Sequence, residues 1–128
     1  MDLKTQKKLE IFLPALESFE AVLKKDISDE FLRDSAIQRF EYTIEIFWKL
    51  LKSYLESEDI EVSSPRDVIK KTCTFNYITN AESELILEML SFRNQTSHDY
   101  AMSVAVSVSP KLKPFAQILR IIITRLFL

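Results

Sequence analysis

The chain contains no glycine among its 128 residues. Glycine is the residue that lets the backbone adopt positive φ angles or approach a phosphate group closely. Phosphate-binding loops and dinucleotide-binding turns depend on it, so the sequence excludes both motifs. Tight two-residue hairpins also favour glycine, which argues against a β-rich fold. The absence of glycine therefore predicts an all-α protein.

Apolar residues recur at intervals of three and four, the pattern of amphipathic helices. Helices are predicted over residues 3–25 and 29–57, then from Pro65, from Thr79 through Arg93, and after Pro114 to the C-terminus. Ser28, Ser64 and Thr79 are the predicted N-caps. The valine-rich residues 99–110 are predicted to be irregular or weakly helical. We expect one domain over residues 1–128, an antiparallel up-and-down four-helix bundle with an additional short or C-terminal helix.

Composition excludes several classes of site. One histidine and one cysteine, Cys73, exclude multi-histidine metal sites and an intrachain disulfide, and we expect no metal and no cofactor. Cys73 is expected to be a small buried hydrophobic residue. The net charge of −2 argues against a protein that coats nucleic acid generally, but allows a local basic patch. Without a signal peptide or a long apolar span, we expect a cytoplasmic protein with no membrane partner.

The densest polar cluster spans residues 93–100 and contains the single histidine. On a helix, Arg93 lies about one turn before His98, so a guanidinium can hold a phosphate while the imidazole moves a proton. Asn94 can orient either group, and Tyr100 places a phenol near the same cleft. Further candidates for lining this cleft are Thr96, Ser97 and Glu41. The alternative is that the cluster only caps a helix and faces solvent.

Other residues admit structural interpretations. Glu41 and Glu45, one turn apart, could ligate a metal, but an ion-paired or solvated face is the simpler interpretation. Trp48 and the phenylalanines that recur at helical spacing are expected to lie in the hydrophobic core or in a dimer interface. Two regions are candidates for that interface, namely the Phe40, Phe47 and Trp48 region and the C-terminal residues 126–128. A basic patch on one predicted helix is expected to face solvent; it comprises Arg66, Lys70 and Lys71.

Several strings occur in an order typical of one family. They are Ile37-Gln38-Arg39-Phe40-Glu41 with Trp48-Lys49, Ser64-Pro65-Arg66-Asp67-Val68-Ile69, Met89-Leu90, and Arg93-Asn94-Gln95-Thr96-Ser97-His98-Asp99-Tyr100. In these strings the chain resembles the nucleotidyltransferase substrate-binding-protein family, the HepT-like branch of the HEPN superfamily. The resemblance covers residues 37–100.

The resemblance implies that each chain folds into a four-helix bundle and that two chains form a homodimer. It also implies a partner protein, a minimal nucleotidyltransferase encoded nearby. Members of this branch are toxins of toxin–antitoxin pairs, metal-independent endoribonucleases with an R-x4-H-x-Y motif. Carried over to this sequence, Arg93, His98 and Asn94 would form the catalytic group acting on RNA. Tyr100 would accept AMP from the nucleotidyltransferase, which would neutralise the toxin. The alternatives are a non-catalytic substrate-binding subunit of a two-component nucleotidyltransferase and a helical bundle with no site.

Overall fold

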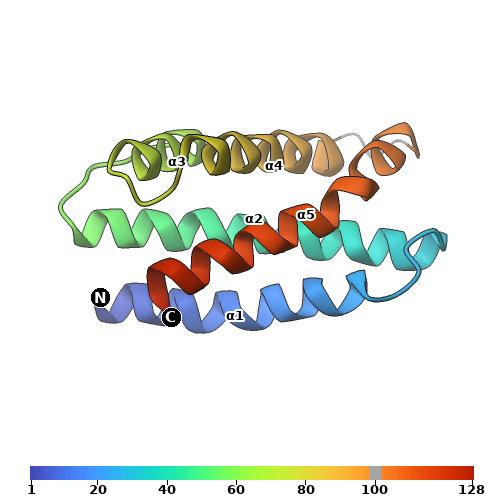
Figure 1. Ribbon diagram of the computed structural model, residues 1–128, viewed down its shortest axis with the longest axis horizontal. Helices are drawn as coiled ribbons and strands as arrows, with labels where there is room; N and C mark the ends of the chain where they lie inside the picture. The colour runs from blue at the N-terminus through green and yellow to red at the C-terminus, as the bar shows by residue number, and fades with distance from the viewer. Residues whose placement is uncertain (99–101) are drawn as a thin grey trace.

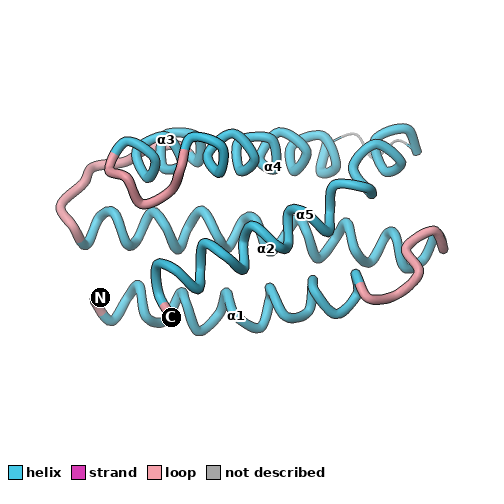
Figure 2. Tube along the Cα trace, in the orientation of Figure 1, coloured by secondary structure: helices cyan, strands magenta, loops and turns pink. Residues whose placement is uncertain are grey.

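The structure is a computed structural model that describes residues 1–98 and 102–128, with Ser97 and His98 described by their backbone only. Five helices and no strand occur in this part of the chain (Figure 1, Figure 2). They are α1 (Leu3–Leu23), α2 (Glu30–Ser57), α3 (Pro65–Thr74), α4 (Asn80–His98) and α5 (Met102–Phe127). The all-α prediction is confirmed for the described residues.

The four long helices form an up-and-down bundle. Figure 1 shows both termini at the same end, with α5 running diagonally across α1 and α2. Two ion pairs show that α4 and α5 are antiparallel, since Glu82 pairs with Arg125 and Glu88 with Lys111. The predicted four-helix architecture with an additional helix is confirmed, and the additional helix is the short α3.

Phenylalanine rings in mutual contact fill the centre of the bundle. Phe12 of α1 packs on Phe47 of α2 with ring centroids 5.6 Å apart, and Phe19 packs on Phe40 at 6.2 Å. Phe115 of α5 closes the core on Phe40 at 5.7 Å. All five side chains are almost fully buried, and each such burial contributes about 1.5–3 kcal/mol to stability. Phe40 and Phe47 are therefore unavailable for a dimer interface, and that part of the sequence-based suggestion is wrong.

Two helices end without the glycine that usually follows a helix. Asp59 after α2 has φ of 60° and Asn76 after α3 has φ of 64°. Beyond each of them the chain turns back, because the Ile60 N–H donates to the Leu55 carbonyl and the Tyr77 N–H donates to the Thr72 carbonyl. Asp and Asn are the non-glycine residues that best tolerate this left-handed conformation. The glycine-free sequence thus terminates helices with these two residues.

Two of the three predicted N-cap residues lie at the start of a helix in the structure. Ser64 caps α3 and Thr79 precedes α4 in a reciprocal pair with Glu82, whose carboxylate accepts from the Thr79 N–H at 2.9 Å. The prediction for Ser28 is wrong. Its hydroxyl donates to Asp26 at 2.6 Å, while Asp29 caps α2 by accepting from the Leu32 N–H.

The valine-rich stretch differs from the prediction that residues 99–110 are irregular or weakly helical. Residues 102–110 are helical and belong to α5, which continues through Pro110 and Pro114, while residues 99–101 lie outside the described part. Ala105 and Val108 are buried at helical spacing, so core packing outweighs the strand-like alternation. Both prolines lie on the exposed side, where water can satisfy the carbonyls that lose their helical partners. Figure 1 shows α5 changing direction after its first turns.

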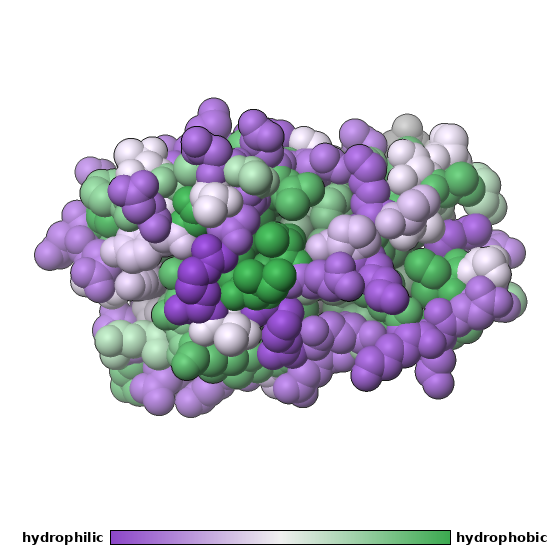
Figure 3. All heavy atoms as spheres, viewed as in Figure 1, coloured by the Kyte–Doolittle hydropathy of each residue, from purple (hydrophilic) through white to green (hydrophobic). Residues whose placement is uncertain are grey.

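The surface is chemically mixed. Figure 3 shows a hydrophobic area over the middle of α5, surrounded by hydrophilic residues. On α5, Ile121 is exposed, whereas Ile122 and Ile123 are buried. Cys73, expected to be buried, is only half-buried, and its thiol donates to the Asn80 side chain at 3.0 Å. Among the described helices, none has the length and apolar character needed to cross a bilayer.

Candidate functional site

Arg93 lies on α4 and points toward α2. Its Nη1 is 3.8 Å from Glu41 Oε2, and its Nε is 3.9 Å from Glu45 Oε2. The side chain is 28% exposed, and the Nε is buried without a hydrogen-bond acceptor among the described residues. These separations are ion-pair contacts longer than hydrogen bonds, so the guanidinium is held electrostatically and keeps unused donors. The predicted ion-paired face of Glu41 and Glu45 is confirmed.

The guanidinium borders a surface hollow of about 420 Å³. The walls of the hollow come from α2 and α4, and its lining residues are Gln38, Glu41, Tyr42, Glu45, Ile46 and Arg93. Tyr42 is tied to α1, because its hydroxyl donates to the Ser18 hydroxyl at 3.0 Å. The hollow therefore combines one cation, two carboxylates and a phenol. Such a mixed lining suits a polar ligand whose anionic group reaches Arg93.

A second hollow, of about 210 Å³, lies on another side of the same arginine. Its lining residues are Glu45, Trp48, Ser64, Pro65, Arg66, Leu90, Arg93 and Asn94. This brings the start of α3 next to Arg93 and Asn94. Arg66 is held in place by a hydrogen bond from its Nη2 to the Ser91 hydroxyl at 2.7 Å. Two guanidinium groups thus border one depression.

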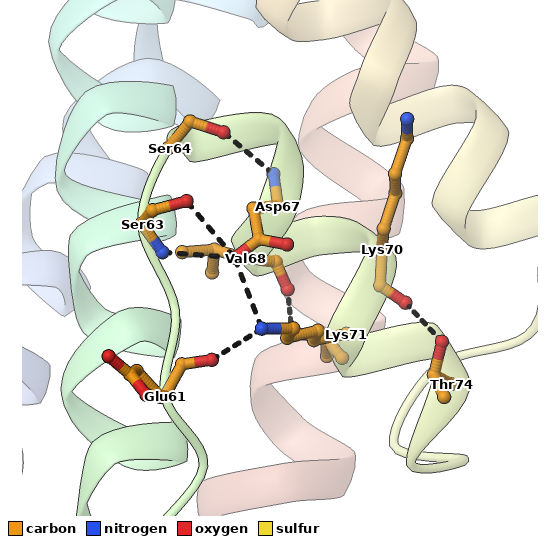
Figure 4. Close-up of polar contacts among 9 residues, drawn as sticks. Glu61, Ser63, Ser64, Asp67, Val68, Lys70, Lys71 and Thr74 are labelled. Atoms are coloured by element: carbon orange, nitrogen blue, oxygen red, sulfur yellow. Dashed lines mark hydrogen bonds and ion pairs between the residues drawn. The ribbon is translucent and has the colours of Figure 1, made fainter.

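The start of α3 is fixed by a compact set of polar contacts (Figure 4). The Ser64 hydroxyl accepts from the Asp67 N–H at 3.1 Å, and the Asp67 carboxylate accepts from the Ser63 N–H at 2.9 Å. The bond from the Ser63 N–H, aided by the charge of Lys71 at 3.5 Å, holds the pKa of Asp67 below its usual value. Lys71 also donates to the Glu61 carbonyl at 2.6 Å. These contacts set where Pro65 and Arg66 stand.

The other predicted site residues fall in different places. Thr96 is buried, and its hydroxyl donates to the Arg93 carbonyl at 3.2 Å, so it braces the backbone of α4. Asn94 is exposed at the second hollow. Ser97 and His98 belong to the last turn of α4, but their side chains lie outside the described part, as does Tyr100 entirely. The structure therefore places Arg93 next to Glu41 at the first hollow and next to Asn94 at the second.

The sequence matches, over residues 7–126, the family described as "Nucleotidyltransferase substrate binding protein like". The chain belongs to this family. The resemblance drawn from the motifs is thus confirmed. No curated protein sequence matches the chain.

Solved structures share the fold of this family member. A crystal structure of a Thermus thermophilus protein is 33% identical, with a TM-score of 0.85 and coverage of 91% of this chain and 99% of that one. A tri-AMPylated HEPN toxin from Shewanella oneidensis in complex with MNT antitoxin is 22% identical, with a TM-score of 0.71 and coverage of 97% and 99%. A tyrosine-to-alanine mutant of the MntA-HpeT toxin-antitoxin is 21% identical, with a TM-score of 0.69 and coverage of 89% and 98%.

Two features of this family member's site were missed by sequence reasoning. Trp48 was interpreted as core or interface, yet it is half-buried and its Nε1 donates to Glu45 at 3.1 Å beside Arg93. Arg66 is exposed, as the sequence predicts, but its position at the same depression as Arg93 does not follow from the sequence. The sequence does contain an indication that Trp48 belongs to the site. Glu41, Glu45 and Trp48 follow each other at intervals of four and three, which puts them on one face of α2.

Proposed function

We propose that this protein is the toxin of a toxin–antitoxin pair, a metal-independent endoribonuclease whose site is the Arg93, His98 and Tyr100 motif. The observation that carries the proposal is the state of Arg93. Within the described part of the chain, ion pairs of 3.8 and 3.9 Å alone anchor its guanidinium on α2, and its Nε has no hydrogen-bond acceptor. An arginine with unused donors at the edge of a hollow is well suited to receive a phosphate.

The motif supplies the two groups that RNA cleavage without a metal requires. His98 would take the proton from a ribose 2′-hydroxyl, whose oxygen then forms a bond to phosphorus while the bond to the 5′-oxygen breaks. The departing oxygen takes up a proton from water, and His98 loses the proton it had taken to the hydroxide that remains. Arg93 would stabilise the negative charge that develops on the phosphorus oxygens, and Asn94 at the second hollow would hydrogen-bond to the same group. Arg93 and His98 are five residues apart and both belong to the C-terminal part of α4.

Neutralisation would act on Tyr100. Its phenol oxygen would form a bond to the α-phosphorus of ATP held by a partner nucleotidyltransferase encoded nearby, and pyrophosphate would leave. Each AMP adds negative charge and bulk beside Arg93, which would repel and exclude RNA. The shared fold with a tri-AMPylated toxin bound to its antitoxin supports this part of the proposal. We further propose a cytoplasmic homodimer, in which two copies of the motif face one cleft.

A second candidate function rests on the carboxylates. Glu41 and Glu45 lie within 4 Å of Arg93 and add negative charge where an RNA phosphate would bind. This observation favours a non-catalytic substrate-binding subunit of a two-component nucleotidyltransferase, in which the hollow presents a substrate, or Tyr100 itself, to the enzyme. The two candidates differ in whether the chain cleaves RNA by itself.

Cleavage of total RNA by the purified chain in excess EDTA tests the proposal. We expect fragments ending in 2′,3′-cyclic phosphate with the wild type and none with Arg93→Ala or His98→Ala. Equal cleavage by the wild type and His98→Ala would contradict it. Intact-mass analysis after co-expression with the neighbouring nucleotidyltransferase should show increments of AMP that vanish in Tyr100→Phe. An unmodified chain that co-purifies with the nucleotidyltransferase and leaves RNA intact would establish the second candidate.

A further inference from the structure

A third hollow, of about 300 Å³, lies between α1 and α2 and is rich in lysine. Its lining residues are Lys4, Lys8, Trp48, Lys49, Lys52, Ser53 and Glu56. Four lysines and one glutamate give this lining a net charge of +3 at pH 7, whereas the whole chain carries −2. Four of the 17 basic residues of this chain thus gather at one depression. We call this depression the lysine hollow.

The helices hold the lysines of this hollow in register. Lys4 and Lys8 are one turn apart on α1, and Lys49 and Lys52 are one turn apart on α2. Between the two pairs, the Thr5 and Ser53 hydroxyls form a buried hydrogen bond of 2.8 Å that joins the two helices. Each buried hydroxyl needs the other as its hydrogen-bond partner, so the pair fixes how α1 lies along α2. The four ammonium groups therefore converge from two helices on one depression.

Three of the four lysines form no close ion pair in the described part of the chain. Lys49 pairs with Glu45 at 3.5 Å. Lys4, Lys8 and Lys52 form no ion pair with any carboxylate in the described part of the chain. Glu56 lines the hollow without approaching a lysine to within ion-pair distance. Like charges gathered without partners destabilise a fold, so their clustering points to an anionic ligand.

Trp48 connects the lysine hollow to Arg93. The same indole lines the lysine hollow and the hollow that contains Arg93 and Asn94. Its Nε1 donates to Glu45 at 3.1 Å, and Lys49 Nζ lies 5.8 Å from its ring centroid. Trp48 is half-buried, so part of the residue is accessible from the surface. An aromatic ring next to several lysines is the arrangement that proteins use to bind single-stranded nucleic acid.

We propose that the lysine hollow binds the phosphate backbone of single-stranded RNA, that Trp48 stacks on one base, and that this contact directs the strand to Arg93. This inference rests on the proposed ribonuclease function, because it names the surface that holds the substrate outside the motif. Lysine ammonium groups bind phosphates as point charges without reading sequence, so binding is sequence-tolerant. An acidic protein surface would also be attracted to the lysines, but it would make no use of the indole.

The test measures binding of a fluorescein-labelled 2′-O-methyl oligouridylate, about twelve nucleotides long to match one small binding domain. The 2′-O-methyl groups prevent cleavage, so affinity is measured independently of activity. The test variant is Lys4→Gln, Lys8→Gln, Lys52→Gln in the full chain. The control variant, Lys24→Gln, Lys25→Gln, Lys113→Gln, removes the same charge from exposed lysines elsewhere on the surface. Circular dichroism and thermal unfolding confirm that both variants fold.

We expect the test variant to lose about tenfold or more in affinity at low salt, and the slope of log K against log salt to fall by about 2. The control should lose far less. Trp48 is the single tryptophan, so quenching of intrinsic fluorescence by RNA reports directly on its stacking. Quenching that is strong in the wild type and weak in the test variant would place the base on the indole. Equal affinities and slopes for the test and control variants would overturn the proposal.

Two further outcomes separate this inference from the proposed function. Lysine-dependent binding and quenching in a chain that never cleaves RNA would refute the ribonuclease and leave the binding surface intact. If cleavage depends on His98 while the lysine variant binds RNA normally, the lysine hollow is not the RNA-binding surface, and the ribonuclease proposal stands.

A different result would identify another occupant of the lysine hollow. If the lysine variant binds RNA normally but no longer co-purifies with the nucleotidyltransferase, the hollow docks an acidic protein surface, and the RNA proposal is overturned.

Discussion

The indole nitrogen of Trp48 donates a hydrogen bond to the Glu45 carboxylate at 3.1 Å. The other contacts of that carboxylate are an ion pair with Lys49 on one side and one with Arg93 on the other. Glu45 therefore stands between the lysine hollow and the candidate phosphate-binding arginine. Its charge orients Arg93 and at the same time competes with any phosphate that approaches. The behaviour of variants at the site depends on this balance.

Removing the two carboxylates beside Arg93 should strengthen anion binding. In the double variant Glu41→Gln, Glu45→Gln, the arginine loses ion pairs of 3.8 and 3.9 Å, each a partly exposed contact of about 0.2–1 kcal/mol. We expect affinity for the 2′-O-methyl oligouridylate to rise a few-fold, measured by fluorescence anisotropy. Glu10→Gln, Glu84→Gln makes the same charge change at exposed positions and serves as the control. An unchanged or reduced affinity in the first variant alone would show that Arg93 does not receive the phosphate.

Arg93 should matter for activity far more than for stability. Among the described residues its side chain makes only two long ion pairs, so Arg93→Ala should lower the free energy of unfolding by about 2 kcal/mol or less. Loss of the charge that stabilises the transition state should lower the rate of RNA cleavage by about 10²–10³-fold. Arg93→Lys should recover little, because an ammonium lacks the planar donor array. Urea unfolding and a gel-based cleavage assay measure the two effects, and a variant that unfolds would contradict this division.

The phenylalanine core should tolerate no truncation. Phe40 contacts both Phe19 and Phe115, so Phe40→Ala would leave a cavity at the junction of three helices. We expect a loss of about 3–5 kcal/mol in the free energy of unfolding, measured by urea denaturation. Phe31 on the first turn of α2 is 81% exposed, and Phe31→Ala should change stability by less than about 0.5 kcal/mol. Similar losses for both variants would mean that Phe31 is covered in solution.

The contribution of Asp67 should depend on pH. The hydrogen bond from the Ser63 N–H lowers the folded-state pKa of Asp67 below the unfolded value of about 3.9. The charged carboxylate therefore stabilises the fold at neutral pH, and this stabilisation disappears as the pH falls through the folded-state pKa. Asp67→Asn should be less stable than the wild type at about pH 7, with the gap closing below about pH 4. Urea unfolding across this range measures the gap, and a pH-independent difference would rule out the carboxylate as its source.

A glycine placed after α3 should stabilise the protein. Asn76 has φ of 64°, a conformation that glycine adopts without steric cost. Asn76→Gly is expected to raise the free energy of unfolding by about 0.5–1 kcal/mol, whereas Asn76→Ala should lower it, because a β-carbon is strained there. Thermal and urea unfolding of the pair provide the comparison. If the alanine variant were as stable as the glycine variant, the left-handed conformation at this position would be disproved.

The helices and the family followed from local patterns. Phe12 and Phe19 of α1 are seven residues apart, as are Phe40 and Phe47 of α2, and such spacing is a property of one helix that needs no partner to be recognised. The caps at Ser64 and Thr79 were equally local, because each involves contacts over three residues. The cluster of residues 93–100 and the strings around it were sufficient to identify the family.

Only the tertiary structure decided which residues share a site. Arg93 meets Glu45 and Trp48 because α4 lies along α2 in one register, and that register depends on how the whole core packs. The start of α5 was decided in the same way, since burial of Ala105 and Val108 outweighs the local preference of a valine-rich, proline-containing segment. Local sequence determines what a segment can become, while contacts between residues far apart in the chain determine where its side chains meet.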